Sequence, residues 1–470
     1  MRLFVTPYRY LPIVLACAGG WSASAEVVRL KNGNVIYADQ VKEAGNKVQY
    51  AVGDDTYTIP KALVQSIDRA APSPSRSPEL PTYTPTIHVG GEERLLDQVV
   101  HAGAVNRDAL NSIESRGNAA ETAIAFYIAG RQEFQDGKYG DAHRDFESAL
   151  RYDPQNPAIV NFYAALLVKT GNAQQAIPYA DRAVRLAPDS ADALVVSGYA
   201  LYAAGRPKDA IQSWKHSLQL RPDASVQRLI EHAGRELAAE SNYSERETGH
   251  FVLRYEGTQS SESLRAQILS ALESEYTQLA QSFGVEPRSA IQVVLYTNRA
   301  FFDVTQAPSW TGALNDGKLR IPVQGIDSVT PDLARILKHE LAHSFVNQLS
   351  MGRCPAWLNE GIAQAMEPRL LGPRGARLAA LFREEHEIPL NMLEGGFTSL
   401  SGMEASLAYD ESLAAVDYLR ATYGMSDLLR ILQKLGQGDS TESAFRSTVH
   451  CDYRQLQSDV GSFLLRQFGN

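Results

Sequence analysis

The most constraining feature of this sequence is the pattern H-E-x-x-H, which residues 339–343 carry within the run KHELAH. Apolar residues recur around it at helical spacing, and residues 330–332 (TPD) have the order of an N-cap, a first-position proline and a first-turn acid. On a helix, His339 and His343 lie one turn apart and project from the same face. Two such imidazoles can share one Zn²⁺, and Glu340 can serve as general base toward a water that the metal activates.

A third metal ligand is predicted at Glu360. Gly352 and Pro355 interrupt the helical pattern after His343, so Glu360 falls on a second predicted helix. Two histidines and one carboxylate leave the fourth tetrahedral position open, which is typical of a catalytic rather than a structural zinc. A fortuitous motif that binds no metal is the competing interpretation.

Residues 357–361, Trp-Leu-Asn-Glu-Gly, resemble the W-L-N-E-G string in which the gluzincin metallopeptidases (the peptidase MA clan) carry their third zinc ligand. The resemblance covers about residues 250–430. It implies an α+β zincin-like domain that hydrolyses peptide bonds with one Zn²⁺ per chain. The ligands would be His339, His343 and Glu360, and the general base would be Glu340.

The resemblance also implies where the substrate lies. In this clan an edge strand directly before the zinc helix carries the peptide, which makes Gly312, Ala313 and Leu314 candidate contacts. They lie in a hairpin predicted over residues 310–323, with its turn at residues 315–317 (NDG). A plain edge strand without substrate is the structural alternative.

Three further residues are candidates for supporting roles. The clan commonly uses a downstream Tyr or His to support the oxyanion, and Tyr409, at the start of a helix predicted after residues 395–396, is the candidate here. A buried aromatic is the alternative. Gln364 and Glu367, one and two turns after Glu360, are expected to orient the two histidines.

The N-terminus has the pattern of a secretory signal peptide over residues 1–25. Arg2 and Arg9 precede an apolar run too short to span a membrane, and residues 23–25 (ASA) form a small-x-small cleavage site. The sequence therefore predicts export, to the periplasm or the medium of a bacterium, without a transmembrane helix. Cys17, in a weak lipobox, leaves a lipid anchor as the alternative.

Net charge and cysteine content bear on the possible partners of the protein and on whether it can form a disulfide. The net charge is −9 and there is no basic run, so no nucleic-acid partner is expected. Removal of the signal peptide leaves Cys354 and Cys451, an even count that permits one disulfide in an oxidising compartment. Two unrelated buried thiols are the alternative.

The N-terminal half contains a small β module and a linker. Short β-rich runs separated by turn signals occupy residues 26–69 and fit a small SH3-like barrel. Residues 70–92 are rich in proline and serine and are predicted to be an extended linker. The sequence of the β module does not indicate its role.

Residues 93–240 contain a repeat of 34 residues. Small residues and prolines recur in register, as in Gly137, Gly171 and Gly205, in Gly130, Ala164 and Gly198, in Ala142, Ala176 and Ala210, and in Pro154, Pro188 and Pro222. We interpret the small residues as sites of close helix packing and the prolines as ends of second helices.

The pattern resembles tetratricopeptide repeats, at about residues 123–156, 157–190 and 191–224. Helices predicted over residues 93–116 and 223–240 would cap the stack. A concave surface for a peptide or protein partner is one interpretation of the repeats, and a spacer packed against the catalytic domain is the other.

These features predict a multi-domain chain with a small all-β module, an all-α repeat solenoid and an α+β zincin-like domain over residues 246–470. We expect an exported zinc metallopeptidase whose repeats recruit a peptide or protein substrate, or a protein partner. The competing hypotheses are a repeat scaffold with a degenerate zincin domain, and a zinc hydrolase that acts on something other than peptides.

The mature protein is expected to begin near Glu26, because Ala23 and Ala25 fit a signal-peptide cleavage site. N-terminal sequencing of protein purified from its native compartment checks this expectation. An intact Met1, or a lipidated terminus at Cys17, would contradict it.

Overall fold

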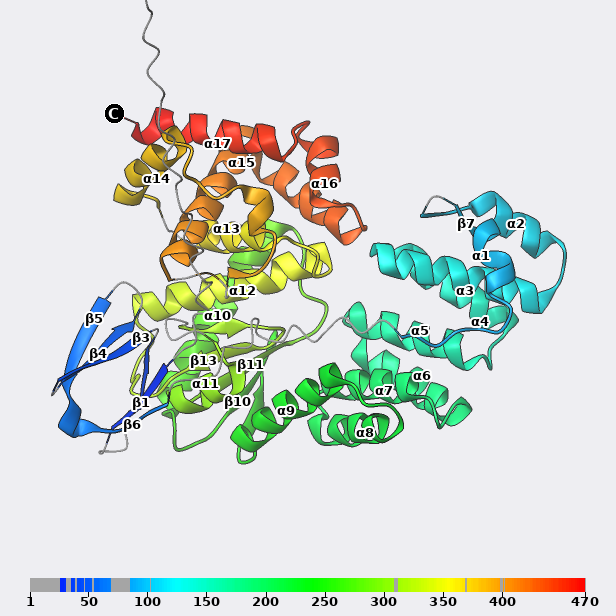
Figure 1. Cartoon of the computed structure of the whole chain (residues 1–470), viewed down its shortest axis with the longest axis horizontal. Coiled ribbons are helices and arrows are strands. Elements are labelled where there is room, and N and C mark those ends of the chain that lie inside the picture. Colours follow the sequence, from blue (N-terminus) through cyan, green and yellow to red (C-terminus); the bar gives the residue numbers. More distant parts are fainter. Residues whose placement is uncertain are drawn as a thin grey trace, which may run out of the picture. The chain divides into compact units, whose positions relative to one another are not determined.

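The computed structural model describes residues 26–30, 35–38, 40–45, 47–52, 55–68, 85–101, 103–307, 312–367, 370–397, 400 and 402–469. The predicted signal peptide and most of the predicted linker lie outside these ranges. The chain divides into two compact units, residues 1–73 and 74–470 (Figure 1). Among the helices of the described residues, none has the length and apolar character needed to cross a membrane.

The first unit consists of short antiparallel strands in two three-stranded sheets. One sheet has the order β2-β1-β6 and the other has the order β3-β4-β5. The strands are β1 (Glu26–Leu30), β2 (Val35–Ala38), β3 (Gln40–Ala44), β4 (Lys47–Val52), β5 (Asp55–Pro60) and β6 (Val64–Asp68), with the 3₁₀ turn η1 (Lys61–Leu63) before β6. Val28, Val41 and Val48 form a small buried core. The SH3-like barrel itself stays a prediction.

The second unit begins with a helical repeat region. Its helices are α1 (Glu93–Val99), α2 (Arg107–Ser115), α3 (Ala119–Asp136), α4 (Tyr139–Tyr152), α5 (Pro157–Lys169), α6 (Ala173–Leu186), α7 (Ala191–Ala203), α8 (Pro207–Leu220) and α9 (Ala224–Ala239). The pairs α3–α4, α5–α6 and α7–α8 correspond to the three predicted repeats. The prediction of helix throughout residues 93–116 is wrong at its centre, where β7 (Val100–His101) and β8 (Ala104–Val105) pair as a small hairpin.

The repeated glycines serve two different purposes. Gly130 and Gly198 allow close packing, since a Cβ at Gly130 would lie 2.9 Å from Phe146 and one at Gly198 would lie within 2.7 Å of the Trp214 ring. Gly171 does not pack as predicted, because an added Cβ would meet no atom within 4 Å. Its φ of 79° lies in the left-handed region, which ends α5 and favours glycine.

Residues 85–92 belong to the repeat region rather than to the predicted linker. The backbone N–H of Thr86 donates to Asp192 Oδ2 at 3.1 Å, and Tyr127 Oη donates to the carbonyl oxygen of Ile87 at 2.8 Å. Val89 is buried in the core of the repeats. This segment therefore lies against α3 and α7, the first helices of the first and third repeats.

The C-terminal region places helices around a mixed five-stranded sheet with the order β12-β13-β11-β10-β9. Strands β10, β11 and β13 are parallel, and the two edge strands are antiparallel to their neighbours. The strands are β9 (Ser244–Glu247), β10 (Phe251–Tyr255), β11 (Ile291–Tyr296), β12 (Leu314–Asn315) and β13 (Leu319–Pro322). The helices are α10 (Glu262–Phe283), α11 (Asn298–Thr305), α12 (Pro331–Ser350), α13 (Ala356–Met366), α14 (Pro373–Arg383), α15 (Gly402–Gly436), α16 (Thr441–Thr448) and α17 (Tyr453–Phe468), with the 3₁₀ turn η2 (Leu390–Leu393).

The helix that carries the H-E-x-x-H pattern is α12. Its apolar face is buried against the sheet and α10, where the ring of Phe345 lies 5.2 Å from that of Tyr276 and 5.5 Å from that of Phe283. On its other side α12 packs against α13, which in turn packs against α15 (Figure 1). This layering fixes two neighbouring helices, α12 and α13, on which the candidate ligands lie.

The repeat region and the C-terminal region belong to the same compact unit and touch at two places. Arg353, just after α12, lies against Gly137 in the turn between α3 and α4, and its Nη2 donates to the Gly438 carbonyl at 3.2 Å. Helix α9 meets the sheet at the second place. Such contacts are what a spacer packed against the catalytic domain would make, and they do not bear on whether the repeats also bind a partner.

Gly198→Ala is expected to destabilise the protein by roughly 1–3 kcal/mol, because the added methyl group would overpack the buried Trp214 ring. Gly234→Ala in α9 is the matched control, since a Cβ there meets no atom within 4 Å and alanine favours the helix. Thermal unfolding of the two variants checks the expectation. Equal unfolding temperatures would contradict it.

Candidate active site

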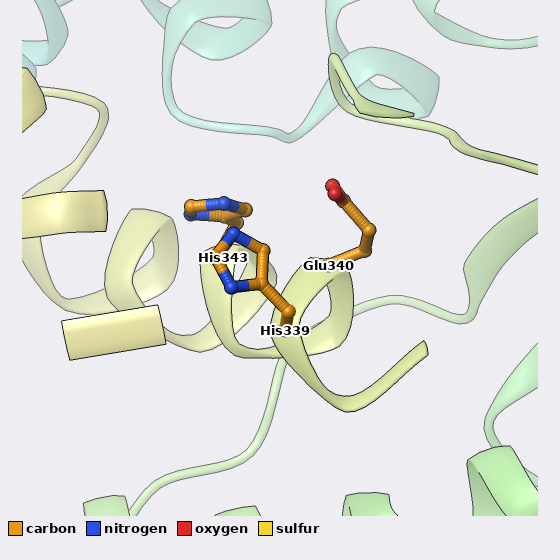
Figure 2. Close-up of side chains that lie close together, drawn as sticks. All are labelled: His339, Glu340 and His343. Atoms are coloured by element: carbon orange, nitrogen blue, oxygen red, sulfur yellow. The ribbon is translucent and has the colours of Figure 1, made fainter. Parts of the chain in front are cut away.

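Helix α12 begins as its sequence predicts. The Thr330 side chain accepts from the Leu333 N–H at 3.2 Å, Pro331 occupies the first helical turn, and Asp332 lies there as well. Because Leu337 and Leu341 are buried on the core side, the helix presents His339 and His343 on another face. The two rings are 4.9 Å apart, centroid to centroid, and nearly perpendicular (Figure 2).

Glu360 on α13 reaches both histidines. Its Oε2 atom lies 3.3 Å from His339 Nε2 and 3.8 Å from His343 Nε2. This oxygen is buried, and it has no hydrogen-bond partner among the residues that the structure describes. A buried carboxylate oxygen without a partner is unfavourable by itself, so a cation between the three atoms would satisfy it.

Helix α13 reaches this position because Gly361 has no side chain. A Cβ at Gly361 would lie 2.6 Å from Val416 Cγ2 and still closer to the carbonyl oxygen of Ser412, both on α15. The other end of α13 is held by Trp357, which is fully buried and donates from its ring N–H to Tyr453 Oη at 3.2 Å. Residues 357–361 thus contain both the candidate ligand Glu360 and the residues that position its helix.

The Nδ1 atom of each histidine has its own partner. His339 Nδ1 donates to Glu367 Oε1 at 3.1 Å, and Arg335 Nη1 holds the other oxygen of Glu367 at 2.6 Å. His343 Nδ1 donates to Asn359 Oδ1 at 2.9 Å. With the proton on Nδ1, each ring directs the lone pair of Nε2 toward Glu360, as a metal-binding histidine requires.

The supporting residues only partly match those expected from the sequence. Glu367 contacts His339, although it lies just past the last turn of α13 rather than on the helix. Gln364 instead donates to the Tyr409 carbonyl at 2.8 Å and joins α13 to α15. Asn359 was not predicted, because its contact with His343 depends on the packing of α13 against α12 and no sequence spacing indicates it.

The charges around His339 favour a bound cation. Burial lowers the pKa of His339, but Glu360 and Glu367 outweigh burial and raise it to about 10. Burial raises the pKa of Glu360, whereas His343 and His339 lower it, and the net direction is downward. The carboxylates that hold a proton on the imidazole would hold a divalent ion in its place.

Glu340 differs from these residues in position and environment. Its carboxylate projects away from the paired imidazoles, on the same helix (Figure 2). It is only 9% exposed, and burial raises its pKa against the opposing effect of His339 and His343. A carboxyl with a raised pKa beside a metal-binding pair is suited to receive and return a proton.

Zinc fits the donor set. Among the residues that the structure describes, His339, Glu340 and His343 are the group whose candidate ligand atoms all lie within 4.8 Å of one another. Two imidazole nitrogens and a carboxylate oxygen are ligands typical of Zn²⁺. His339, His343 and Glu360 would hold the ion, and Glu340 lies beside it.

The candidate substrate residues lie at an edge of the sheet. Leu314 belongs to β12, the edge strand, while Ala313 is buried and Gly312 lies near Ile336 of α12. Asn315, next to them, donates from Nδ2 to the Glu340 carbonyl at 2.6 Å and to Ser344 Oγ at 2.8 Å. The edge strand is therefore bonded directly to α12.

The prediction that a helix begins at Tyr409 is wrong. Helix α15 already begins at Gly402, and Tyr409 lies inside it with its ring edge against Phe397 at 5.2 Å between centroids. Ala405, Leu407 and Ala408 favour a helix and belong to α15 before the predicted start is reached. Its role as an oxyanion donor stays a prediction.

The two cysteines are free thiols in the structure, so the disulfide that their even number permits is not formed. Burial raises the pKa of Cys451 to about 11 and raises that of Cys354 well above its usual value. The raised pKa favours the protonated form of both thiols at neutral pH. They correspond to the alternative of two separate thiols, of which Cys451 is buried and Cys354 partly buried.

Comparison with known families agrees with the order of these regions. Residues 271–466 match the family model of the Peptidase MA superfamily, and residues 127–191 and 164–225 match that of the tetratricopeptide repeat. The chain therefore contains a Peptidase MA superfamily domain that follows tetratricopeptide repeats. A search of curated proteins finds no match.

Solved structures similar to this chain cover its repeats. The first TPR domain of human RPAP3 is 22% identical, with 26% of this chain and 95% of that chain covered and a TM-score of 0.25. The Arabidopsis OM64 TPR domain is 18% identical, with 25% and 97% covered and a TM-score of 0.24. The N-terminal domain of stress-induced protein-1 from C. elegans is 19% identical, with 25% and 98% covered and a TM-score of 0.23.

Asn359→Ala and Glu367→Gln are each expected to weaken zinc binding roughly 10–100-fold, because they release one imidazole from its orienting partner. Competition with a chelating dye measures the affinity. Asn347→Ala is the control, because Asn347 is an exposed residue of α12 one turn after His343. Affinities equal to that of the control would refute the orienting roles.

Proposed function

We propose that this protein is a zinc-dependent peptidase of the gluzincin type. The observation that supports this most is the convergence of Glu360 Oε2 on His339 Nε2 and His343 Nε2, with both Nδ1 atoms held by other residues. Bound Zn²⁺ supplies Lewis-acid polarisation of the substrate carbonyl and lowers the pKa of water. The matching superfamily domain over residues 271–466 is consistent with a hydrolase of this kind.

Glu340 is the proposed general base. It takes a proton from the attacking water and delivers it to the nitrogen of the departing amine. Because its raised pKa comes from burial, Glu340 holds the proton more readily between the two transfers than an exposed carboxylate would. Asn315, which also donates to Ser344 Oγ, fixes the backbone carbonyl of Glu340, and Tyr409 is the proposed donor to the oxyanion.

The substrate is proposed to be an extended peptide that pairs with the edge strand. Among the residues that the structure describes, β12 pairs with β13 alone, so its other side would offer main-chain groups for hydrogen bonding. Peptide groups of Gly312, Ala313 and Leu314 would align the substrate beside α12. This placement would bring a substrate carbonyl toward the two histidines.

The remaining parts of the chain are proposed to bring the peptidase to its substrate. Tetratricopeptide repeats form surfaces that bind proteins, and here they would recruit the substrate or a partner. Export by the N-terminal signal would place the enzyme in the periplasm or outside the cell, unless Cys17 carries a lipid.

Glu340→Gln is expected to keep about one Zn²⁺ per chain and to lower peptide hydrolysis by roughly 10²–10⁴-fold, since it removes the general base and keeps the ligands. His343→Ala and Glu360→Ala should lose zinc and activity together. Metal analysis and cleavage of a quenched fluorescent peptide mixture measure both properties. Glu384→Gln, an exposed carboxylate after α14, is the control.

A repeat scaffold with a degenerate peptidase domain makes the opposite prediction. The wild-type protein would then hold little zinc, and none of the four variants would differ from it. Wild-type protein without zinc after careful purification, or a Glu340→Gln variant that still cleaves peptides, would refute the proposed function.

A further inference from the structure

A group of charged and polar side chains joins the repeat region to the C-terminal sheet next to the edge strand. We name it the hairpin network, and its members are buried or partly buried and bonded to one another. It comprises Glu236 and Glu240 from the end of α9, together with Arg254, Tyr296, Asp316, Lys318 and Arg320. Lys318 and Arg320 belong to the hairpin of β12 and β13.

Arg320 is the centre of the hairpin network and is only 1% exposed. Its Nε donates to both carboxylate oxygens of Asp316 at 3.0 Å, and its Nη1 donates to Tyr296 Oη at 2.8 Å. The same Nη1 atom lies 3.7 Å from Glu236 and 3.8 Å from Glu240. One guanidinium thus contacts the hairpin turn, the sheet and the repeat helix.

Further bonds connect the two carboxylates of α9 to the sheet. Lys318 forms an ion pair with Glu236, which also accepts a hydrogen bond from Tyr202 of α7. Glu240 pairs with Arg254 of β10 and accepts a hydrogen bond from Tyr296 of β11. Apolar contacts border these bonds, where Ala239 and Tyr243 pack with Tyr296, Phe301 and Leu314.

The burial of these charges makes the arrangement rigid. Burial raises the pKa of Glu236, but Lys318 and Arg320 outweigh burial and lower it to about 2, so the carboxylate stays ionised. Three carboxylates and three cations balance one another within the network. Removing one partner of a buried pair leaves an uncompensated charge, which is strongly unfavourable. Helix α9 therefore cannot shift without disturbing the hairpin.

The opposite side of the hairpin is bonded to the zinc helix. Asn315 of β12 donates to the Glu340 carbonyl and to Ser344 Oγ. Arg320 of β13 is the strand partner of Leu314, which precedes Asn315 in β12. The hairpin is consequently fixed on one side to α9 and on the other to α12. The register of the edge strand beside the candidate active site depends on both attachments.

We propose that α9 of the repeat region is a positioning element of the candidate active site, in which Glu236 and Glu240 hold Lys318 and Arg320 so that the edge strand lies in register for an extended peptide. The proposal rests on the proposed function for its meaning in catalysis. Glu236, Glu240, Lys318 and Arg320 are positioning residues, since they act through the hairpin.

Hydrogen exchange of the full-length protein tests the positioning without substrate. Glu236→Gln is expected to speed exchange of the backbone amides of residues 312–323 on the order of 100-fold, while α17 keeps its protection. Glu231→Gln, an exposed residue of the same helix, is the matched control and should exchange like the wild type. If Glu236→Gln does not fold, Tyr296→Phe, which removes one hydroxyl between Arg320 and Glu240, carries the same expectation.

Kinetics and a double-mutant cycle supply the second readout. Glu236→Gln should raise KM for an extended peptide about tenfold with kcat little changed, because the strand that receives the peptide is displaced while the ligands are not. Zinc content should stay near one per chain. The double variant Glu236→Gln/Lys318→Met should be no worse than either single variant, since both remove the same interaction.

Unchanged exchange over residues 312–323 in a folded Glu236→Gln variant would overturn the proposal. Faster exchange spread evenly over the whole C-terminal region, or additive effects in the cycle, would also overturn it, because both indicate general destabilisation. Wild-type protein that cleaves no peptide would refute the proposed function instead, and the exchange measurement would still decide whether α9 positions the hairpin.

Discussion

The close approach of α13 to α15 at Gly361 is the constraint on which the candidate site depends. Any side chain at this position would collide with Val416 and with the Ser412 backbone, and α13 would be displaced from α15. Glu360 is the neighbouring residue, and its Oε2 must lie within about 2.0–2.2 Å of a shared ion to bind it. A displacement of even 1 Å would therefore move the candidate third ligand out of reach, which is a physical reason for a glycine after the glutamate.

Polar and charged side chains around the two histidines fix the orientation of both imidazole rings. Each imidazole has one nitrogen bonded to α13 or to the residue after it, through Asn359 and Glu367, and the other nitrogen faces Glu360. Arg335 from α12 balances part of the charge of Glu367. Helices α12 and α13 are thus held together by the same polar contacts that set the donor atoms, so the packing of the pair and its metal-binding geometry have a common origin.

Much of this arrangement could be predicted from the sequence, because it depends on local patterns. The N-cap at Thr330, the spacing of His339 and His343, the break before α13 and the hairpin turn at residues 315–317 are all short-range signals, and the structure has each of them. The repeat period of 34 residues likewise predicted three helix pairs, which the structure contains. The helix start near Tyr409 was predicted wrongly, because Ala405, Leu407 and Ala408 upstream of it already belong to α15.

Features that depend on distant parts of the chain could not be predicted in the same way. Asn359 lies beside His343 only because α13 turns back along α12, and no spacing rule indicates that contact. The hairpin network could not be predicted from the sequence either. Glu236, Arg254 and Arg320 are isolated charges in the sequence, and they come together only when α9 packs on the sheet.

A charged junction of this kind differs in its consequences from an apolar one. Apolar surfaces tolerate sliding with little loss of energy, whereas the bidentate contact of Arg320 with Asp316 and its bond to Tyr296 fix both distance and direction. Burying these charges is expensive, so the junction adds little net stability beyond what apolar packing would give. Its proposed effect is to restrict the hairpin to one register, and register matters most where β12 is bonded to α12. The geometry beside Glu340 is in this sense shared between the peptidase domain and the last helix of the repeats.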